Sequence, residues 1–224
     1  MTCVQAPRCV WMPQALLDFT AGAGENAAAG GAVFCLPGSA PEMKGLLRRN
    51  MIRPLKPTEF DSFYSLLEAS LPPDEFRAHD DQRRALDDPA FCPYVLVDAQ
   101  EAVRGLVTVW NFEDFAFIEH LAVAPELRCG GLGSALLQDA FARRPKRFCL
   151  EVDPPETALA RRRIAFYERN GLSLNAEYPY IQPSLGAGRR PLPLLLMTSG
   201  GAAPREVLDR IRDTVYARVY RRWS

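Results

Sequence analysis

Residues 115–152 contain a strand, a glycine-rich turn, a helix and a second strand, and this succession constrains the fold most. "FAFIEHLAV" (115–123) and "RFCLEV" (147–152) are short apolar runs, while "SALLQDAFARR" between them has helical spacing. Strands joined through a helical crossover lie parallel, whereas strands joined by tight turns lie antiparallel. We therefore predict a parallel pair of strands connected by a helix over about residues 131–143.

The segments on either side of this unit predict the rest of a mixed sheet. Upstream, we expect strands at "MIRPL", "YVLVDA" and "RGLVTVWNF", and helices over 58–71, capped by Thr58, and over 73–88. Downstream, we expect a helix ending at Gly171 ("ETALARRRIAFYERNG") and then the strands "AEYPYIQ" and "LPLLLMTS". The fold class is therefore α/β, with a mostly antiparallel sheet, one parallel pair and flanking helices.

The chain divides into three parts. Residues 1–50 are rich in Ala and Gly without a sustained period ("AGAGENAAAGGAVFCLPGSAP"), so we expect a disordered extension or, alternatively, a true translation start at Met51. Residues 51–200 carry the alternating strands and helices of one domain. Within residues 201–224, Pro204 opens an amphipathic helix that we expect to pack on its own sheet or on a partner.

Composition argues against several classes of protein. Lys plus Arg equals Asp plus Glu at 27 each, and no apolar run approaches 18 residues, so neither nucleic acid nor a membrane is an expected partner. Six scattered cysteines without a C-x-x-C pair, and only two histidines, do not favour a metal site. The cysteine pattern suits a reducing compartment, and the N-terminus lacks the pattern of a secretory signal, so we predict a cytoplasmic protein.

The turn before the central helix has the features of an anion site. The first N–H groups of a helix have no intrahelical partner, the helix dipole makes that end positive, and glycine lets the backbone approach a ligand. "RCGGLGS" lacks the Lys of a Walker loop and the G-x-G-x-x-G spacing of a Rossmann turn, which leaves R-x-x-G-x-G from Arg128 to Gly133. This pattern predicts a phosphate cradle or, alternatively, only a tight connection.

Two motifs resemble a known family. "HLAVAPELRCGGLGSALL" resembles the acetyl-coenzyme A (acetyl-CoA) signature of the GNAT superfamily of N-acetyltransferases, and "ARRRIAFYERNGL" is similar to that family's next motif, F-Y-E-x-x-G-F on a helix. The resemblance covers about residues 51–200. It implies a twisted GNAT-like sheet whose parallel strands splay apart around the pantetheine arm. The chain departs from the family at Ala160, where many members have Asn, and at Leu172, where Phe is common.

The resemblance implies a set of contacts with acetyl-CoA; no metal is expected, because of the cysteine and histidine pattern. The backbone of Leu121 and Val123 would pair with the pantetheine amides, and the N–H of Leu121 would donate to the oxyanion. The pyrophosphate would lie on the turn and on the start of the helix. The residues expected there are Arg128, Cys129, Gly130, Gly131, Leu132, Gly133 and Ser134.

Two side chains are predicted to carry the chemistry. A period of two places Glu119 on the strand face of Leu121 and Val123, near the thioester, where it would take the amine proton directly or through water. The alternative is an acid paired to an arginine. Tyr167 matches the family's tyrosine that points at the coenzyme sulfur, and we expect it to act as an acid; the alternative is a core aromatic.

Other polar side chains are predicted to be structural. We expect Glu151 and Asp153 to form a solvated strand end, with contact to the acceptor or to water as the alternative, and we expect His120, facing away from Glu119, to be packed in the core. Residues 161–163, three arginines, are expected on an exposed helix face.

The sequence thus predicts an acetyl-CoA-dependent N-acetyltransferase that modifies a primary amine, on a small molecule or a protein, by direct attack. A non-catalytic acyl-CoA-binding regulatory module is the alternative. The C-terminal helix is compatible with a monomer or a homodimer.

Overall fold

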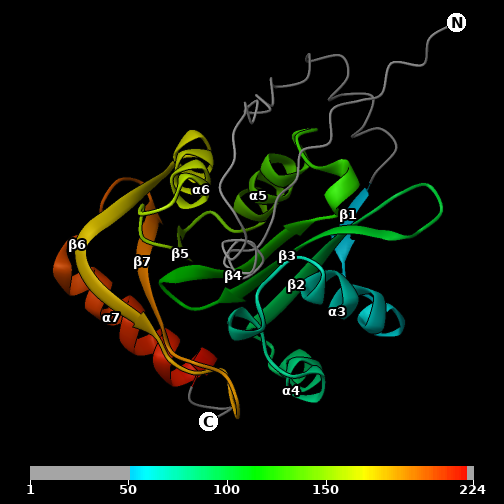
Figure 1. Ribbon diagram of the computed structural model, residues 1–224, viewed down its shortest axis with the longest axis horizontal. Helices are drawn as coiled ribbons and strands as arrows, with labels where there is room; N and C mark the ends of the chain where they lie inside the picture. Colours follow the sequence, from blue (N-terminus) through cyan, green and yellow to red (C-terminus); the bar gives the residue numbers. More distant parts are fainter. Residues whose placement is uncertain (1–50, 221–224) are drawn as a thin grey trace, which may run out of the picture.

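The computed structural model describes residues 51–220, which form one seven-stranded sheet with helices on both faces (Figure 1). The expected extension over 1–50 and the last four residues lie outside the described part of the chain. The strands follow the order β1-β2-β3-β4-β5-β7-β6 across the sheet. Their bounds are β1 Met51–Pro54, β2 Phe91–Val97, β3 Val103–Asn111, β4 Phe115–Val123, β5 Arg147–Val152, β6 Leu172–Gln182 and β7 Leu192–Ser199.

The sheet is antiparallel except at its centre. Strands β1 to β4 follow one another as antiparallel neighbours, and β7 pairs antiparallel with both β5 and β6. Strands β4 and β5 pair in parallel and are joined by α5 (Leu132–Arg143), as a helical crossover requires. The predicted mixed sheet with one parallel pair is confirmed.

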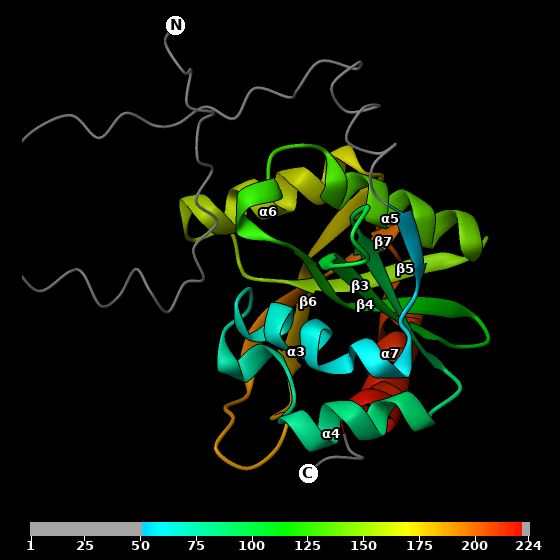
Figure 2. The same cartoon turned by 90° about the vertical axis from the view of Figure 1, so that its right-hand side faces the viewer.

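Figure 2 shows the sheet between two helical layers. Helices α5 and α6 (Ala158–Arg169) cover one face, and α3 (Phe60–Glu68), α4 (His79–Arg84) and α7 (Arg205–Val215) cover the other. The apolar stripe of α7 is buried against the sheet of its own chain, and a π-helical turn, Tyr216–Tyr220, continues it. We call these the α5 face and the α7 face.

The helices before β2 differ from the prediction. Helix α3 begins at Phe60 after a 3-10 turn over Pro57–Glu59, and Thr58 caps neither element. The helix predicted over 73–88 is interrupted, because Phe76 is extended and buried and Arg77 is fully buried. A 3-10 turn over Pro73–Glu75 and the short α4 replace it, which turns polar residues toward the interior.

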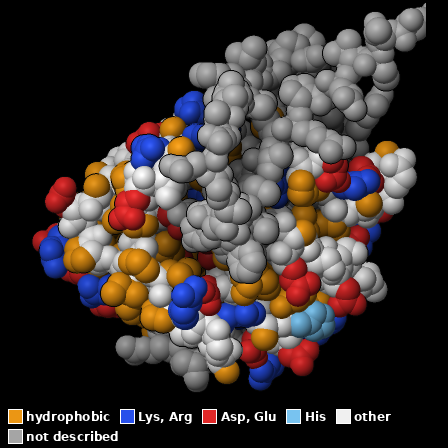
Figure 3. All heavy atoms as spheres, viewed as in Figure 1, with side chains coloured by type: hydrophobic (Ala, Val, Ile, Leu, Met, Phe, Trp, Pro, Cys, Tyr) orange, Lys and Arg blue, Asp and Glu red, His pale blue; other side chains and the backbone are white. Residues whose placement is uncertain are grey.

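The surface of the described residues carries charges of both signs. In Figure 3, acidic and basic side chains are interspersed with apolar ones wherever described residues are visible. None of the helices within residues 51–220 is long and apolar enough to cross a membrane.

Candidate active site

Strands β4 and β5 part halfway along β4. Their parallel pairing runs from Phe115 with Arg147 to Ile118 with Leu150 and ends there. Beyond Ile118, β4 continues to Val123 in contact with β3 alone, among the strands that the structure describes. One edge of β4 is therefore left without a strand partner, as an extended ligand between splayed strands requires.

The backbone of β4 directs the expected groups toward this gap. Ala124 N–H donates to Arg104 O at 2.8 Å, and bonded and non-bonded pairs alternate in an antiparallel ladder. Val123 and Leu121 therefore occupy positions whose N–H and C=O point away from β3. The carbonyl of Val123 already accepts a bond from Arg128 Nε at 2.9 Å. The N–H groups of both residues have the orientation that the predicted pantetheine pairing requires.

The turn before α5 presents backbone N–H groups. Gly131 is the N-cap with φ 77°, and Cys129 also has a positive φ of 68°. The first helical bond is from Ala135 N–H to Gly131 O at 3.0 Å, so the N–H groups of residues 132–134 have no partner within the helix. Since no side chain caps this end, it retains the positive potential that favours an anion.

Arg128 and Gly133 differ from what the phosphate-cradle prediction expects of them. Arg128 bonds to Val123 O and, at 3.5 Å, to Ser70 Oγ, and burial lowers the pKa of its guanidinium. A Cβ on Gly133 would lie 3.4 Å from Phe166 Cζ, an ordinary contact. The fold therefore requires glycine at Gly131, for its φ, but not at Gly133.

A β-bulge in β4 lies between Ile118 and His120 and changes how Glu119 is oriented relative to Leu121 and Val123. Thr108 of β3 pairs with His120, and Val109 pairs with Ile118, so Glu119 is an extra residue in β4. Bulges of this kind re-aim side chains and are common beside active sites.

The bulge changes the alternation of β4. Leu121 and Val123 pack on the α5 face, whereas Glu119 and His120 both point to the α7 face. The prediction that Glu119 shares a face with Leu121 and Val123, and that His120 faces away from it, is wrong, because an inserted residue breaks a period of two. His120 is buried, as predicted, and its Nε2 contacts Glu75 O at 3.1 Å.

Glu119 lies in a buried ion pair. Its carboxylate is 2.7 Å from Arg77 Nη1 and accepts a hydrogen bond from Trp110 Nε1 at 2.8 Å. The side chains of Arg77 and Glu119 are only 0% and 3% exposed. Burial acts to raise the pKa of Glu119, but the charge of Arg77 opposes it, and the pKa is lowered. The pairing with an arginine, one of the two expected roles, is present; the role of base stays a prediction.

A small pocket opens beside Glu119 at the carboxyl end of β5. It gathers side chains from the 3-10 turn Pro73–Glu75, from α6 and from four strands. Its lining consists of Glu75, Glu119, Glu151, Val152, Asp153, Arg163, Gln182 and Leu194.

Two of the four carboxylates in this pocket are compensated by cations. Glu119 pairs with Arg77, and Asp153 pairs with Arg163 at 2.8 Å. Glu75 and Glu151 form no ion pair with any residue of the described range. Burial is the main cause that raises the pKa of each of these two carboxyls to about 7. The pocket therefore carries an excess of negative charge when both are ionised.

Glu151 is held by two tyrosines. Tyr180 and Tyr220 both donate their hydroxyls to its carboxylate, the latter at 2.7 and 2.9 Å to the two oxygens. The prediction of a solvated strand end is wrong for Glu151, because the π-helical turn after α7 covers it.

Tyr167 faces the same region from α6. Its ring packs edge-on against Phe166, and burial raises the pKa of its hydroxyl to about 12, with Arg163 and Glu75 close enough to modulate it. The hydroxyl keeps its proton at neutral pH and, within residues 51–220, makes no hydrogen bond. Its role as an acid stays a prediction.

The sequence interpretation did not single out Glu75, Arg77 or Tyr220. The first two lie in "PDEFRAHDD", a pattern that predicts a polar helix. An apolar residue, Phe76, stands between them in this polar segment, and it is buried in the structure. Arg163, expected on an exposed helix face, points into the pocket.

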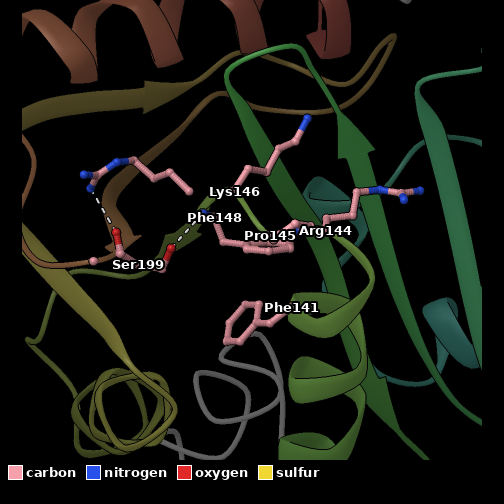
Figure 4. Close-up of a pocket in the computed structure, with 8 residues that line it drawn as sticks. Phe141, Arg144, Pro145, Lys146, Phe148 and Ser199 are labelled. Carbon is pink, nitrogen blue, oxygen red and sulfur yellow. Dashed lines mark hydrogen bonds between the residues drawn. The ribbon is translucent and has the colours of Figure 1, made fainter.

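A larger hollow lies at the opposite end of β5 (Figure 4). Three cations line it, but Lys146 donates to Phe112 O at 2.6 Å and Arg147 to Ser199 O at 2.9 Å. Arg144 donates to Tyr94 Oη at 3.1 Å. The hollow is remote from the splay of β4 and β5, so we do not assign the active site to it in spite of its size.

A sheet opened by a parallel splay, with a helix N-terminus at the mouth of the gap, is the architecture of an acyl-CoA-dependent acetyltransferase. The chain belongs to the acetyltransferase (GNAT) family, whose model matches residues 60–172. A solved structure described as a putative GNAT-family acetyltransferase from Bacteroides thetaiotaomicron is 30% identical. The match covers 76% of this chain and 98% of that one, with a TM-score of 0.68.

Two more distant structures share the fold. A spermidine N-acetyltransferase from Vibrio cholerae is 18% identical over 67% of this chain and 93% of its own, with a TM-score of 0.50. The ribosomal-protein-S18-alanine N-acetyltransferase from Escherichia coli is 19% identical over 70% and 97%, also at 0.50. The search of curated proteins finds no match.

Proposed function

We propose that the protein is an acetyl-CoA-dependent N-acetyltransferase that modifies a primary amine by direct attack. Beyond membership of the family, the observation that carries this proposal is the charge of the pocket beside the splay. Glu75 and Glu151 have no cationic partner among the described residues, and a primary amine is a cation at neutral pH. An amine that enters this pocket would supply the missing positive charge.

The coenzyme would lie along the open edge of β4. The N–H groups of Leu121 and Val123 would pair with the pantetheine arm, and the turn from Arg128 to Ser134 would hold the pyrophosphate. When bound, the coenzyme supplies an acetyl thioester. The N–H of Leu121 would stabilise negative charge that develops on the carbonyl oxygen.

Tyr167 would assist the departing sulfur. Its pKa of about 12 lies above the reference value of about 8.5 for a thiol, so complete proton transfer to the thiolate is uphill unless the tyrosine is reprotonated. The role we propose is a hydrogen bond to the sulfur, with any proton given up replaced from the amine nitrogen.

Glu119 is the carboxylate that the family resemblance assigns as base. Its ion pair with Arg77 weakens it for that task, since a carboxylate with a lowered pKa is a poor proton acceptor. Glu119 would then act through a bridging water or by its charge alone.

The acceptor is an amine on a small molecule or on a protein. The neighbours named above act on spermidine and on the alanine of a ribosomal protein, and both present a primary amine. A cytoplasmic location and a monomeric or homodimeric state remain predictions for this chain.

The test is thiol release from acetyl-CoA by the purified full chain, with a panel of primary amines. The panel includes spermidine and a peptide that begins with alanine, and a reaction without amine is the control. Turnover with at least one amine is expected. Coenzyme binding by calorimetry without turnover on any amine would instead support a non-catalytic acyl-CoA-binding module.

A further inference from the structure

We propose that Glu75, rather than Glu119, takes the proton of the acceptor amine, while Glu151 is held beside it by two tyrosines. This inference rests on the proposed function and assigns the acceptor side of the same site. It follows from how the four carboxylates of the pocket are held, of which Asp153 is paired with Arg163 at 2.8 Å.

Three contacts pin the turn that carries Glu75. His120 Nε2 lies 3.1 Å from Glu75 O, and Gln182 Nε2 donates to Asp74 O at 3.1 Å. The N–H of Arg190 donates to the Asp74 carboxylate at 2.9 Å. The backbone of Glu75 is thus fixed to β4, to β6 and to the loop after β6, while its side chain lines the pocket.

Glu119 is poorly suited to accept a proton. Arg77 is fully buried and lies 2.7 Å from it, so protonation of Glu119 would remove the negative charge that faces a buried guanidinium at this distance. Loss of one partner of a buried ion pair is strongly unfavourable. The pair therefore keeps Glu119 ionised throughout a reaction cycle.

Glu151 is restrained by its hydrogen bonds. Its two oxygens accept from Tyr180 and Tyr220, which fix the carboxylate against the α7 side of the pocket. These bonds favour the charged form, although burial outweighs them. A carboxylate so held can attract a cation, but its lone pairs are largely engaged.

Glu75 is the remaining carboxylate that can accept a proton. Within residues 51–220 its carboxylate makes no hydrogen bond and no ion pair, and it is partly exposed to the pocket. Its pKa of about 7, raised first by burial, matches the pH at which a general base works best. Glu75 is also close enough to Tyr167 to contribute to the raised pKa of its hydroxyl.

Glu75 and Tyr167 together account for the two protons that leave the amine nitrogen. The ammonium form of the amine gives one proton to Glu75, which later releases it to solvent. The free amine then forms the C–N bond as the C–S bond breaks. The second proton leaves the nitrogen and replaces the one that Tyr167 passes to sulfur, so the products are an amide and a thiol.

The test compares pH profiles of kcat/KM, at saturating acetyl-CoA, for the wild type and for matched Glu→Gln variants. Spermidine is the first amine, followed by any better acceptor in the panel, and the profiles are corrected for the ionisation of the amine itself. Glu177→Gln is the control, because Glu177 is exposed on β6 and lies outside the pocket. Calorimetry with acetyl-CoA and thermal melts check that each variant binds the coenzyme and folds.

The wild type and Glu177→Gln should share an acid limb near pH 7. Glu75→Gln should lose about 10²–10⁴-fold in kcat/KM together with that limb, while coenzyme affinity is unchanged. Glu75→Asp should restore part of the rate and the limb. Glu151→Gln should raise KM for the amine and keep the limb.

Two results would overturn the assignment. If Glu75→Gln keeps the wild-type rate and limb, the inference fails while the proposed function stands. If a folded Glu119→Gln variant loses the limb and Glu75→Gln does not, the base is Glu119. A wild type that binds acetyl-CoA but releases no thiol with any amine would refute the proposed function and this inference with it.

Discussion

The candidate site has a coenzyme half and an acceptor half, and the two consist of different chemical groups. The proposed coenzyme half consists of backbone groups from one stretch of chain, from Leu121 to Ser134. The proposed acceptor half consists of charged side chains from four separate segments, the turn Pro73–Glu75, β4, the end of β5 and α6, which the fold brings together around Glu75 and Glu151. Backbone groups serve in the same way whatever side chains they carry, whereas a cluster of carboxylates depends on each partner.

This difference predicts how each half responds to change. The coenzyme half should be sensitive to backbone conformation and insensitive to pH. The acceptor half should be sensitive to the loss of a charge and should titrate near neutrality. Variants in each half should therefore differ in what they change, and Arg77→Met is expected to have the largest effect.

Arg77→Met should have the largest effect, on stability. It leaves the Glu119 carboxylate buried without its cation, so the free energy of unfolding should fall by about 3–5 kcal/mol in urea titrations. Adding Glu119→Gln should recover part of that loss, because a neutral amide needs no counter-charge. The control is Arg163→Met, whose pair with Asp153 is more exposed and should matter less. If both variants lost the same free energy of unfolding, the buried pair of Arg77 and Glu119 would contribute no more to stability than the more exposed pair.

Gly131→Val tests the coenzyme half. A β-branched residue at φ 77° costs about 1–3 kcal/mol in strain and distorts the N–H cradle, so acetyl-CoA affinity should drop about 100-fold or more. Gly188 has the same φ of 77° in a distant loop, and Gly188→Val should show the strain without the loss of affinity. Calorimetry that finds equal coenzyme affinity in a folded Gly131→Val protein would remove the cradle from the site.

The contrast also explains what the sequence could predict. The bounds of β4, β5 and β7 match the prediction, and so does the parallel pair. A turn and a helix start are local features, and their N–H groups are unpaired for reasons that any helix shares. A coenzyme half could therefore be proposed from contiguous residues, and its contacts with the coenzyme stay a prediction.

The acceptor half could not be predicted in this way, for two physical reasons. One inserted residue in β4 puts Glu119 on the opposite face from Leu121 and Val123, and a period of two cannot reveal an insertion. The polar run around Arg77 has helical propensity, but burial of Phe76 overrides it. The contact of Tyr220 with Glu151 spans 69 residues of sequence, and nothing local specifies it.

Tyr167→Phe should have an intermediate effect, because it removes one hydroxyl where the two halves meet. Turnover should fall about 100-fold, the low end for general acid catalysis, with coenzyme affinity and stability nearly unchanged. An acyl donor with a more acidic thiol should recover much of the rate if chemistry limits turnover, since a better leaving group needs less help from the hydroxyl. An equal loss of turnover with both acyl donors would mean that Tyr167 only packs against the site and does not donate a hydrogen bond to sulfur.

Glu75→Gln should have the smallest effect on stability. Unlike Arg77→Met, it should increase the free energy of unfolding, and only at neutral and higher pH. The pKa of Glu75 is about 7 in the folded chain against 4.5 ordinarily, so below pH 4.5 the carboxyl is protonated in both states and carries no penalty. As the pH rises to 7 and beyond, the unfolded state ionises more readily, and wild-type stability falls by about 1–3 kcal/mol. The Gln variant has no such group, so its free energy of unfolding should match that of the wild type near pH 4.5 and exceed it by that amount at pH 8.

Urea titrations at several pH values measure the difference in stability. Glu177→Gln is the control, and its difference from the wild type should not change with pH. A difference between Glu75→Gln and wild type that does not change with pH would mean that Glu75 titrates normally, and the acceptor half would then be no more sensitive to pH than the coenzyme half.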